Sequence, residues 1–293
     1  MVHAFPSGPM LLQGFGLAIN SDLSIPGAVP APSDTRAGGA IRITLGDDSH
    51  VGEPRPVFRR DGDTLHFAPL DLGEYVISRD AIHVAKRPGA DIGHVAQLLV
   101  ATALPGLLWM RGKLVLHAAG VVLPGTDRII ALVGDSGAGK STIARYLLDR
   151  GARLAGDDTL ALAPTDDVIS ADGLAGGLFL GRDSDRTFLP IAKSLQAEGR
   201  ALGAILLLDP RREMPVTGPL SGVEAVQAIL SHRHRPTIPL LLGMRGQVMQ
   251  LAGRIAQQVP VLRWPAPLAT EGLLEDSMAG MIAALHGITR GYG

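Results

Sequence analysis

The strongest constraint on this sequence is one glycine-rich segment, Gly134–Ser141. It reads G-D-S-G-A-G-K-S and matches the pattern G-x-x-x-x-G-K-[S/T] at every fixed position. An apolar stretch, Ile129–Val133, leads into it, and a helical pattern follows over Ser141–Arg150 and ends at Gly151, a residue suited to close a helix. The sequence therefore predicts a strand, a tight loop and a helix in that order, with the loop able to hold a phosphate group.

A loop of this kind binds phosphate mainly through its backbone. Its glycines let successive N–H groups point inward, and the N-terminus of the following helix adds partial positive charge. We expect Lys140 to reach the β- and γ-phosphates of ATP and the Ser141 hydroxyl to ligate Mg²⁺. The predicted nucleotide-binding residues are Gly134, Asp135, Ser136, Gly137, Ala138, Gly139, Lys140, Ser141 and Thr142.

The overall composition excludes several classes of protein. The chain has 293 residues, with 27 Lys and Arg against 28 Asp and Glu, so its formal net charge of −1 argues against a generally basic nucleic-acid binder. It has no cysteine, which excludes a disulfide scaffold and cysteine-ligated metal sites. Hydrophobic residues make up 46%, enough for a large core and too many for a disordered chain.

Neither the N-terminus nor the longest apolar stretch predicts a membrane anchor. Met1–Gly16 contains no Lys or Arg, so no secretory signal is predicted. The longest apolar stretch, Val95–Met110, contains Gln97 and Pro105 and is shorter than the roughly 20 residues of a spanning helix. We interpret it as a buried helix pair, kinked or broken near Pro105. A soluble, cytoplasmic protein is expected.

Two regions differ in their pattern. Residues 1–88 predict short strands separated by turns, including Asp61-Gly62-Asp63 as a hairpin turn. Residues 89–293 predict alternating strands and helices, the pattern of an α/β domain. The expected strands are Gln13–Ile19, Ala40–Thr44, Val57–Arg60, Thr64–Phe67, Tyr75–Ser78, Ile82–Ala85, Leu114–Leu123, Arg128–Val133, Arg153–Ala155, Thr159–Ala163, Ala204–Leu208 and Val259–Trp264, and the later helices are Val223–Leu230, Gly243–Gln258 and Glu271–His286.

Two adjacent carboxylates follow the phosphate loop and its helix. Asp157 and Asp158 come at the end of the short apolar strand Arg153–Ala155. In a phosphate-loop fold that strand end faces the bound phosphates, so one carboxylate can hold Mg²⁺ and the other can accept a hydroxyl proton. A plain turn is the alternative, since Asp is common in turns. That second interpretation is preferred for Thr165-Asp166-Asp167, which follows a proline.

Histidine and arginine residues supply weaker candidates. His117 stands alone in the apolar stretch Leu114–Leu123, where a histidine usually belongs to the core. The basic run Ser231–Pro236 can bind an acidic peptide or an anion, but cations at a helix C-terminus are the preferred explanation. In Gly181–Arg186 and at Lys193, cationic side chains can contact a transferring phosphate, although a solvated loop is preferred.

Three sequence blocks together resemble the catalytic domain of HPr kinase/phosphorylase. They are Leu116–Val121, Val133–Ser141 and Gly151–Asp158, in this order and spacing. The resemblance implies a P-loop kinase core related in fold to ATP-dependent phosphoenolpyruvate carboxykinase, with a small β-rich N-terminal region. Gly14–Pro26 is similar to the opening of divergent HPr-kinase-related serine kinases, some of which phosphorylate lasso-peptide precursors at a C-terminal serine.

The resemblance also implies residue roles. Lys140 and Ser141 match the residues that bind nucleotide phosphate and Mg²⁺, Asp157 matches the general base, and Asp158 matches the second acidic residue, which we assign as a metal ligand together with Ser141. His117 matches the histidine beside the phosphates and is the third catalytic candidate. The implied activity is ATP- and Mg²⁺-dependent phosphorylation of a serine on a protein or peptide, by an enzyme that assembles into a homo-oligomer. From the net charge and the apolar segments described above, we expect no nucleic-acid and no membrane partner.

Three features of the family have no counterpart. The later Glu-x-Arg-Gly block with its metal-binding glutamate is missing, the usual His-Gly is His117-Ala118, and the basic segment of the reverse phosphorolysis reaction is not recognisable. The acceptor and the reverse reaction therefore stay open. The alternatives are a small-molecule kinase or carboxykinase-like enzyme, and a non-catalytic nucleotide sensor.

Overall fold

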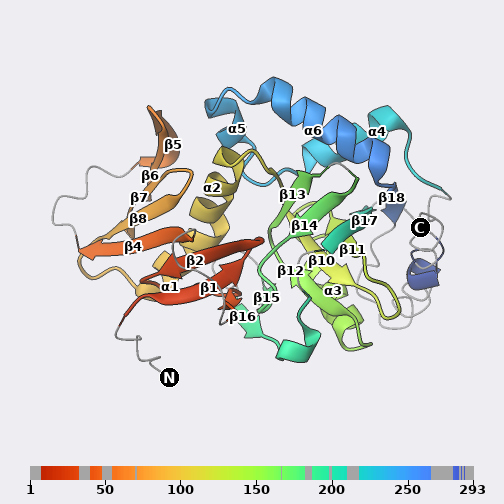
Figure 1. Cartoon of the computed structure of the whole chain (residues 1–293), viewed down its shortest axis with the longest axis horizontal. Helices are drawn as coiled ribbons and strands as arrows, with labels where there is room; N and C mark the ends of the chain where they lie inside the picture. Colours follow the sequence, from red (N-terminus) through yellow and green to blue (C-terminus); the bar gives the residue numbers. More distant parts are fainter. Residues whose placement is uncertain are drawn as a thin grey trace.

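Two large mixed sheets with helices between and around them make up the molecule (Figure 1). The computed structural model describes residues 8–32, 40–47, 55–69, 71–165, 167–181, 187–197, 200–209, 218–264, 280–283, 285 and 287. The first sheet lies at the left of Figure 1 and the second at the right, with the helical segment that follows the first sheet between them. The fold is thus mixed α/β, as the sequence indicates.

The N-terminal part is a sheet in the order β3-β1-β2-β4-β8-β7-β6-β5, which is eight strands within the described residues. The β2–β4 and β4–β8 pairs are parallel, and the other pairs are antiparallel. Gly62 and Asp63 form the two-residue connection between β5 and β6, so the predicted hairpin turn is confirmed. The strands are β1 (Met10–Gly14), β2 (Leu17–Ser21), β3 (Val29–Pro30), β4 (Ile41–Asp47), β5 (Arg55–Asp61), β6 (Thr64–Ala68), β7 (Gly73–Ile77) and β8 (Ala81–Lys86).

One continuous helical segment follows the first sheet. It consists of α1 (Ile92–Leu98), a π-helical stretch η2 (Leu99–Ala103) and α2 (Leu104–Met110). Of the two expected alternatives, a kink or a break near Pro105, the break is wrong, since the helical segment is continuous and a π-helical stretch directly precedes α2. Pro105 has no N–H to offer the carbonyl of Ala101 four residues earlier, and Arg235 Nε donates to that carbonyl instead at 2.9 Å.

The same segment is long and apolar enough by composition to cross a membrane. An 18-residue window of Ile92–Met110 has a mean hydropathy of 1.5, but 67% of that window is buried inside the fold. Trp109 is fully buried, and its Nε1 donates to the carbonyl of His234 at 2.8 Å. The segment packs as a core helix, because its apolar surface is already covered by protein.

The second sheet has the order β12-β10-β11-β17-β14-β13-β9, with β18 beside the C-terminal half of β17. Its central strands β11 and β17 are parallel, whereas β10 runs antiparallel to β11. The strands are β9 (Leu114–Leu116), β10 (Ala118–Val122), β11 (Ile129–Val133), β12 (Arg153–Gly156), β13 (Leu160–Pro164), β14 (Ile169–Asp172), β17 (Arg200–Leu208) and β18 (Val261–Trp264). A separate hairpin joins β15 (Gly177–Leu180) to β16 (Thr187–Pro190).

Hydrophobic cores cover both faces of this sheet. In β11, Ile129, Ala131 and Val133 belong to the larger core shared with the first sheet, while Ile130 and Leu132 face a second core under α3. This alternation explains the uninterrupted apolar sequence of β11, because a strand buried on both faces has no solvent side. The helices of this part are α3 (Lys140–Leu148), the short 3₁₀ turn η4 (Lys193–Leu195), α4 (Gly222–Ser231), α5 (Thr237–Leu241) and α6 (Arg245–Gln258).

Two single strands expected from the sequence are each divided in the structure. Gln13–Ile19 is a hairpin, because Phe15 and Gly16 adopt positive φ values of 55° and 68° and turn the chain between β1 and β2. Leu114–Leu123 is split at His117 into β9, which pairs with β13, and β10, which pairs with β11 and β12. Apolar periodicity carries no mark of such a break, since both halves are equally buried.

Two other predictions fall largely outside the described residues. These are most of the helix Glu271–His286 and the charged stretch Arg182–Arg186. Strands β14 to β16 and helix α5 were not anticipated, because each is short and lacks a clear apolar period.

The two glycines Gly156 and Gly173 allow a close backbone crossing next to the aspartate pair. A Cβ added to Gly156 would lie 2.6 Å from the Cα of Gly173. We expect Gly156→Ala to destabilise the protein by about 1–3 kcal/mol, because backbone must move to admit the methyl group. Urea unfolding measures this. The control is Gly253→Ala, where the added Cβ meets nothing within 4 Å and alanine favours the helix; equal effects of the two changes would contradict the crowding argument.

Candidate functional site

The glycine-rich loop connects β11 to α3 as the sequence predicts. Gly137 and Gly139 have φ values of 81° and 90°, a region that residues with a side chain rarely adopt. A Cβ on Gly134 would lie 2.9 Å from the carbonyl oxygen of Leu208, so the loop fits against β17 only with glycine at this position. Lys140 is the first residue of α3, and only 7% of it is exposed.

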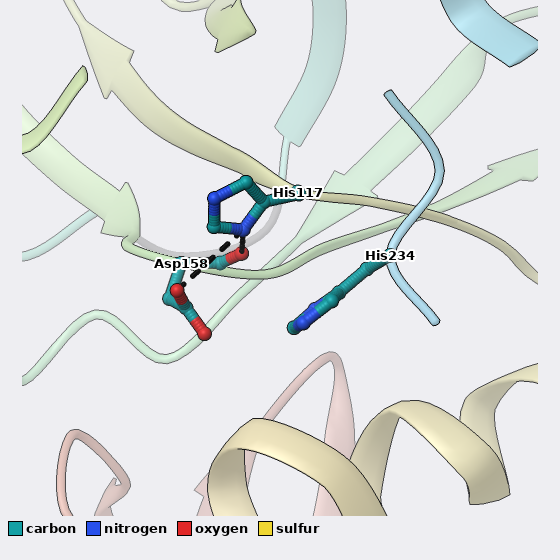
Figure 2. Close-up of side chains that lie close together, drawn as sticks. All are labelled: His117, Asp158 and His234. Carbon is teal, nitrogen blue, oxygen red and sulfur yellow. Dashed lines mark hydrogen bonds and ion pairs between the residues drawn. The ribbon is translucent and has the colours of Figure 1, made fainter. Parts of the chain in front are cut away.

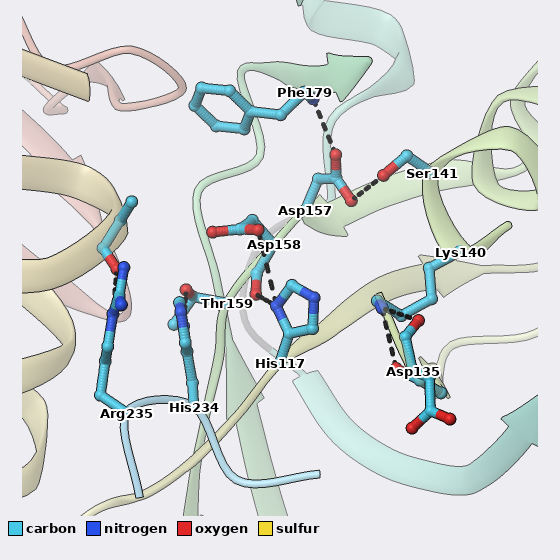
Figure 3. Close-up of polar contacts among 12 residues, drawn as sticks. His117, Asp135, Lys140, Ser141, Asp157, Asp158, Thr159, Phe179, His234 and Arg235 are labelled. Carbon is cyan, nitrogen blue, oxygen red and sulfur yellow. Dashed lines mark hydrogen bonds and ion pairs between the residues drawn. The ribbon is translucent and has the colours of Figure 1, made fainter. Parts of the chain in front are cut away.

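The Lys140 ammonium group lies over its own loop. Nζ donates to the carbonyl of Gly134 at 2.9 Å and to that of Asp135 at 3.1 Å (Figure 3). These contacts hold the positive charge at the mouth of the loop. The arrangement can therefore bind a polyphosphate through backbone N–H groups, the helix N-terminus and one cation.

Asp157 lies beside the start of α3. Its Oδ1 accepts a hydrogen bond from Ser141 Oγ at 3.0 Å, and its Oδ2 accepts one from the Phe179 backbone N–H at 2.7 Å (Figure 3). The residue is 3% exposed. Because a carboxylate has about four lone-pair positions, it can still accept a further donor from a bound hydroxyl group.

Burial raises the pKa of the Asp157 carboxyl from 3.8 to about 6, and the neighbouring charge of Asp158 acts in the same direction. Hydrogen bonds from Phe179 and Ser141 oppose the rise. The site thus holds a carboxylate more basic than an exposed aspartate, which is a useful property for a group that accepts a proton.

This pKa predicts how stability depends on pH in metal-free protein. The folded state holds a proton on Asp157 that the unfolded chain releases near pH 4, so stability falls as pH rises from about 4 through about 6. A rise from 3.8 to about 6 corresponds to about 3 kcal/mol at most. Denaturant unfolding of the parent and of Asp157→Asn at pH 4.5 and 7.5 checks this: the parent should lose stability relative to the variant. A constant difference would contradict it.

Asp158 faces away from Ser141 and toward His117. His117 Nδ1 donates a hydrogen bond to the backbone carbonyl of Asp158 at 3.0 Å and lies 3.5 Å from the Asp158 side-chain Oδ1 (Figure 2). Asp158 has a φ of 70° and is 4% exposed. A non-glycine residue in this conformation costs energy and is characteristic of sites where side-chain direction matters. The turn directs the two adjacent carboxylates to different partners.

His234 reaches the same place from the chain that follows α4. Its backbone N–H donates to the carbonyl of Val115 at 2.8 Å, and His117 N donates to the carbonyl of His232 at 2.9 Å. The segment therefore lies against β9 and the break at His117. The imidazole Nδ1 of His234 is 2.7 Å from Thr159 Oγ1, and the rings of His117 and His234 are 5.2 Å apart.

One cavity of about 680 Å³ unites these features. Its polar side is formed by the phosphate loop, the aspartate pair and His117. The opposite side is formed by the helical segment around η2 and by Leu72. The lining residues are Leu72, His94, Gln97, Leu98, Val100, Ala101, His117, Ser136, Gly137, Gly139, Lys140, Ser141, Thr142, Asp157, Asp158, Phe179, Leu180 and Gly181.

The structure brings most of the predicted site residues together, with a different pairing. Ser141 contacts Asp157, and Asp158 contacts His117, whereas the sequence predicts Ser141 and Asp158 as joint metal ligands. Of the weaker candidates, Lys193 is exposed and does not line the cavity. His234 and the Phe179 backbone were not predicted. The basic run Ser231–Pro236, which contains His234, is the one sequence signal for this segment, and there α4 ends at Ser231 with His232 as its C-cap.

Comparisons with known proteins add little at the level of sequence. No protein-family model and no curated protein matches the chain. Among solved structures, the Hpr(Ser) kinase/phosphatase from Coxiella burnetii is similar at 19% identity and a TM-score of 0.30. That similarity covers 36% of this chain and 68% of the other.

Proposed function

We propose that this protein is an ATP- and Mg²⁺-dependent kinase that phosphorylates a serine hydroxyl on a protein or peptide. One observation carries the proposal: the phosphate loop with Lys140 and the Asp157–Ser141 pair line the same cavity. A donor phosphate and a proton acceptor thereby meet in one space. The resemblance of the three sequence blocks to HPr kinase/phosphorylase supports the same class of reaction.

The loop and Asp157 have separate roles in the proposed transfer. Loop N–H groups and Lys140 bind the ATP phosphates and stabilise the charge that spreads over the transferred group. The serine oxygen forms a bond to the γ-phosphorus, the bond from that phosphorus to the ADP oxygen breaks, and the hydroxyl proton passes to Asp157. Its raised pKa makes Asp157 a suitable acceptor for this proton.

The residues around Ser141 fit a magnesium ion. Hydroxyl and carboxylate oxygens are the donors that Mg²⁺ prefers, and Ser141 lies 3.0 Å from the Asp157 carboxylate, with Asp158 next in the chain. We propose Ser141 as its protein ligand, with the Asp157 carboxylate alongside, because Asp158 is directed toward His117 instead. When bound, Mg²⁺ neutralises phosphate charge and orients the polyphosphate.

Labelled ATP tests the proposal directly. The protein is incubated with Mg²⁺ and three sets of acceptors: peptides with an internal or C-terminal serine, free serine, and oxaloacetate. Label transferred to peptide serine is the expected result. Label on a small molecule alone would replace the proposal with a metabolite kinase or carboxykinase-like enzyme. ATP binding without transfer to any acceptor would favour a nucleotide sensor.

A further inference from the structure

Three side chains from distant parts of the sequence converge beside the cavity, and two of them, His117 and Asp158, line it. His117 stands at the break between β9 and β10, Asp158 follows β12, and His234 follows α4 (Figure 2). Each contributes one donor atom, and these atoms all lie within 4.8 Å of one another. Among the described residues, no other group of three His, Cys, Asp or Glu side chains meets this spacing.

We propose that His117, Asp158 and His234 bind a divalent transition-metal ion. Ligands 2.0–2.2 Å from a metal lie about 3–4 Å from one another, so shifts of about 1 Å would complete the coordination. One pair, His117 Nδ1 and Asp158 Oδ1, is already 3.5 Å apart. A metal at this nitrogen takes the place of its hydrogen bond to the Asp158 carbonyl.

His234 is held in an orientation suited to a ligand. Its backbone is fixed on both sides, by the carbonyl of Val115 and by the Trp109 indole N–H. Its Nδ1 is hydrogen-bonded to Oγ1 of Thr159, and Thr159 is only 1% exposed. With Nδ1 donating to that hydroxyl, the lone pair of the ring lies on Nε2. Histidine ligands commonly have such an outer partner, which fixes the tautomer and the ring direction.

The donor set determines the class of ion. Two imidazoles and one carboxylate suit ions such as Mn²⁺, Fe²⁺, Co²⁺ or Zn²⁺, whereas Mg²⁺ prefers oxygen ligands and water. The Asp158 side chain is 4% exposed and that of His117 is 30% exposed. The site is therefore buried on one side and open to the cavity on the other, which leaves a position for water or a bound phosphate oxygen.

Binding of Co²⁺ to metal-free protein tests the site without ATP or any acceptor, so it does not depend on the proposed kinase reaction. Visible absorption reports the ligand field, and calorimetry gives affinity and stoichiometry. We expect one Co²⁺ per chain, with a spectrum different from aqueous Co²⁺ and little competition from a large excess of Mg²⁺. Aqueous-like absorption together with full displacement by Mg²⁺ would overturn the proposal.

Variants assign the ligands. His117→Ala and His234→Ala should each weaken Co²⁺ binding more than about 100-fold, and Thr159→Val should weaken it about 10–100-fold. The matched control is His83→Ala, an exposed histidine on β8 of the first sheet, which should bind as the parent does. Circular dichroism identifies a variant that fails to fold. If a histidine variant fails to fold, the Co²⁺ affinity of Thr159→Val decides the outcome. Unchanged affinity in His234→Ala or Thr159→Val would overturn the site.

Discussion

Replacing Lys140 with alanine is expected to lower the rate of phosphoryl transfer by at least about 10²–10³-fold while the fold is retained. Lys140 is the only lysine or arginine among the described residues that line the cavity. Two loop carbonyls accept hydrogen bonds from its Nζ and hold it at the loop. The loop N–H groups stay in place in the variant, so ATP binding weakens less than the transfer rate. Charge that develops in the transition state would lose its nearest cation.

Initial rates with labelled ATP measure this effect, and circular dichroism checks the fold. Lys193→Ala is the matched control, because Lys193 is an exposed lysine outside the cavity and should leave the rate unchanged. A Lys140→Ala protein with more than half of the parent rate would exclude the loop as the catalytic phosphate site.

The second large effect is expected for Asp157→Asn. Transfer should fall by about 10²–10⁴-fold, because an amide oxygen is far less basic than a carboxylate and cannot take the hydroxyl proton. Binding of ATP should persist, since Lys140 and the loop are unchanged. In the asparagine variant the amide oxygen still accepts the hydrogen bond from the Phe179 N–H, and the amide nitrogen can donate to Ser141 Oγ. The local structure is therefore preserved.

Calorimetry of ATP binding alongside the transfer assay separates these two outcomes. Asp167→Asn is the control. Asp167 belongs to another Asp-Asp pair of the sequence, is exposed, and lies in the turn closed by the Thr165–Val168 hydrogen bond. Full activity of Asp157→Asn would show that another group accepts the proton. Loss of ATP binding would instead assign Asp157 to the nucleotide site.

The loop was predictable because its function depends on consecutive residues. Gly134 to Ser141 specify a backbone path through glycine conformations and supply lysine and serine within a few residues, so local sequence contains nearly all the required information. The apolar strand before it and Gly151 after its helix are local signals as well. The aspartate pair was recognised for the same reason, by its position at the end of a short strand.

The different contacts of Asp157 and Asp158 were not predictable from the sequence. Asp157 meets Ser141 and the Phe179 N–H, while the positive φ of Asp158 turns the next carboxylate toward His117. Adjacent identical residues carry no sequence signal for this difference. It depends on burial and on partners supplied by β15 and by the break between β9 and β10.

By itself, the sequence determined a neutral, cysteine-free α/β chain with a phosphate loop, because these properties follow from composition and from runs of neighbouring residues. Only the tertiary structure decided that His234 lies beside His117 and Asp158, and that the apolar helical segment forms the other wall of the cavity. These contacts join residues far apart in the chain, through strand pairing and core packing. Such pairings depend on the whole fold, since no local pattern specifies which distant segment covers a given strand end.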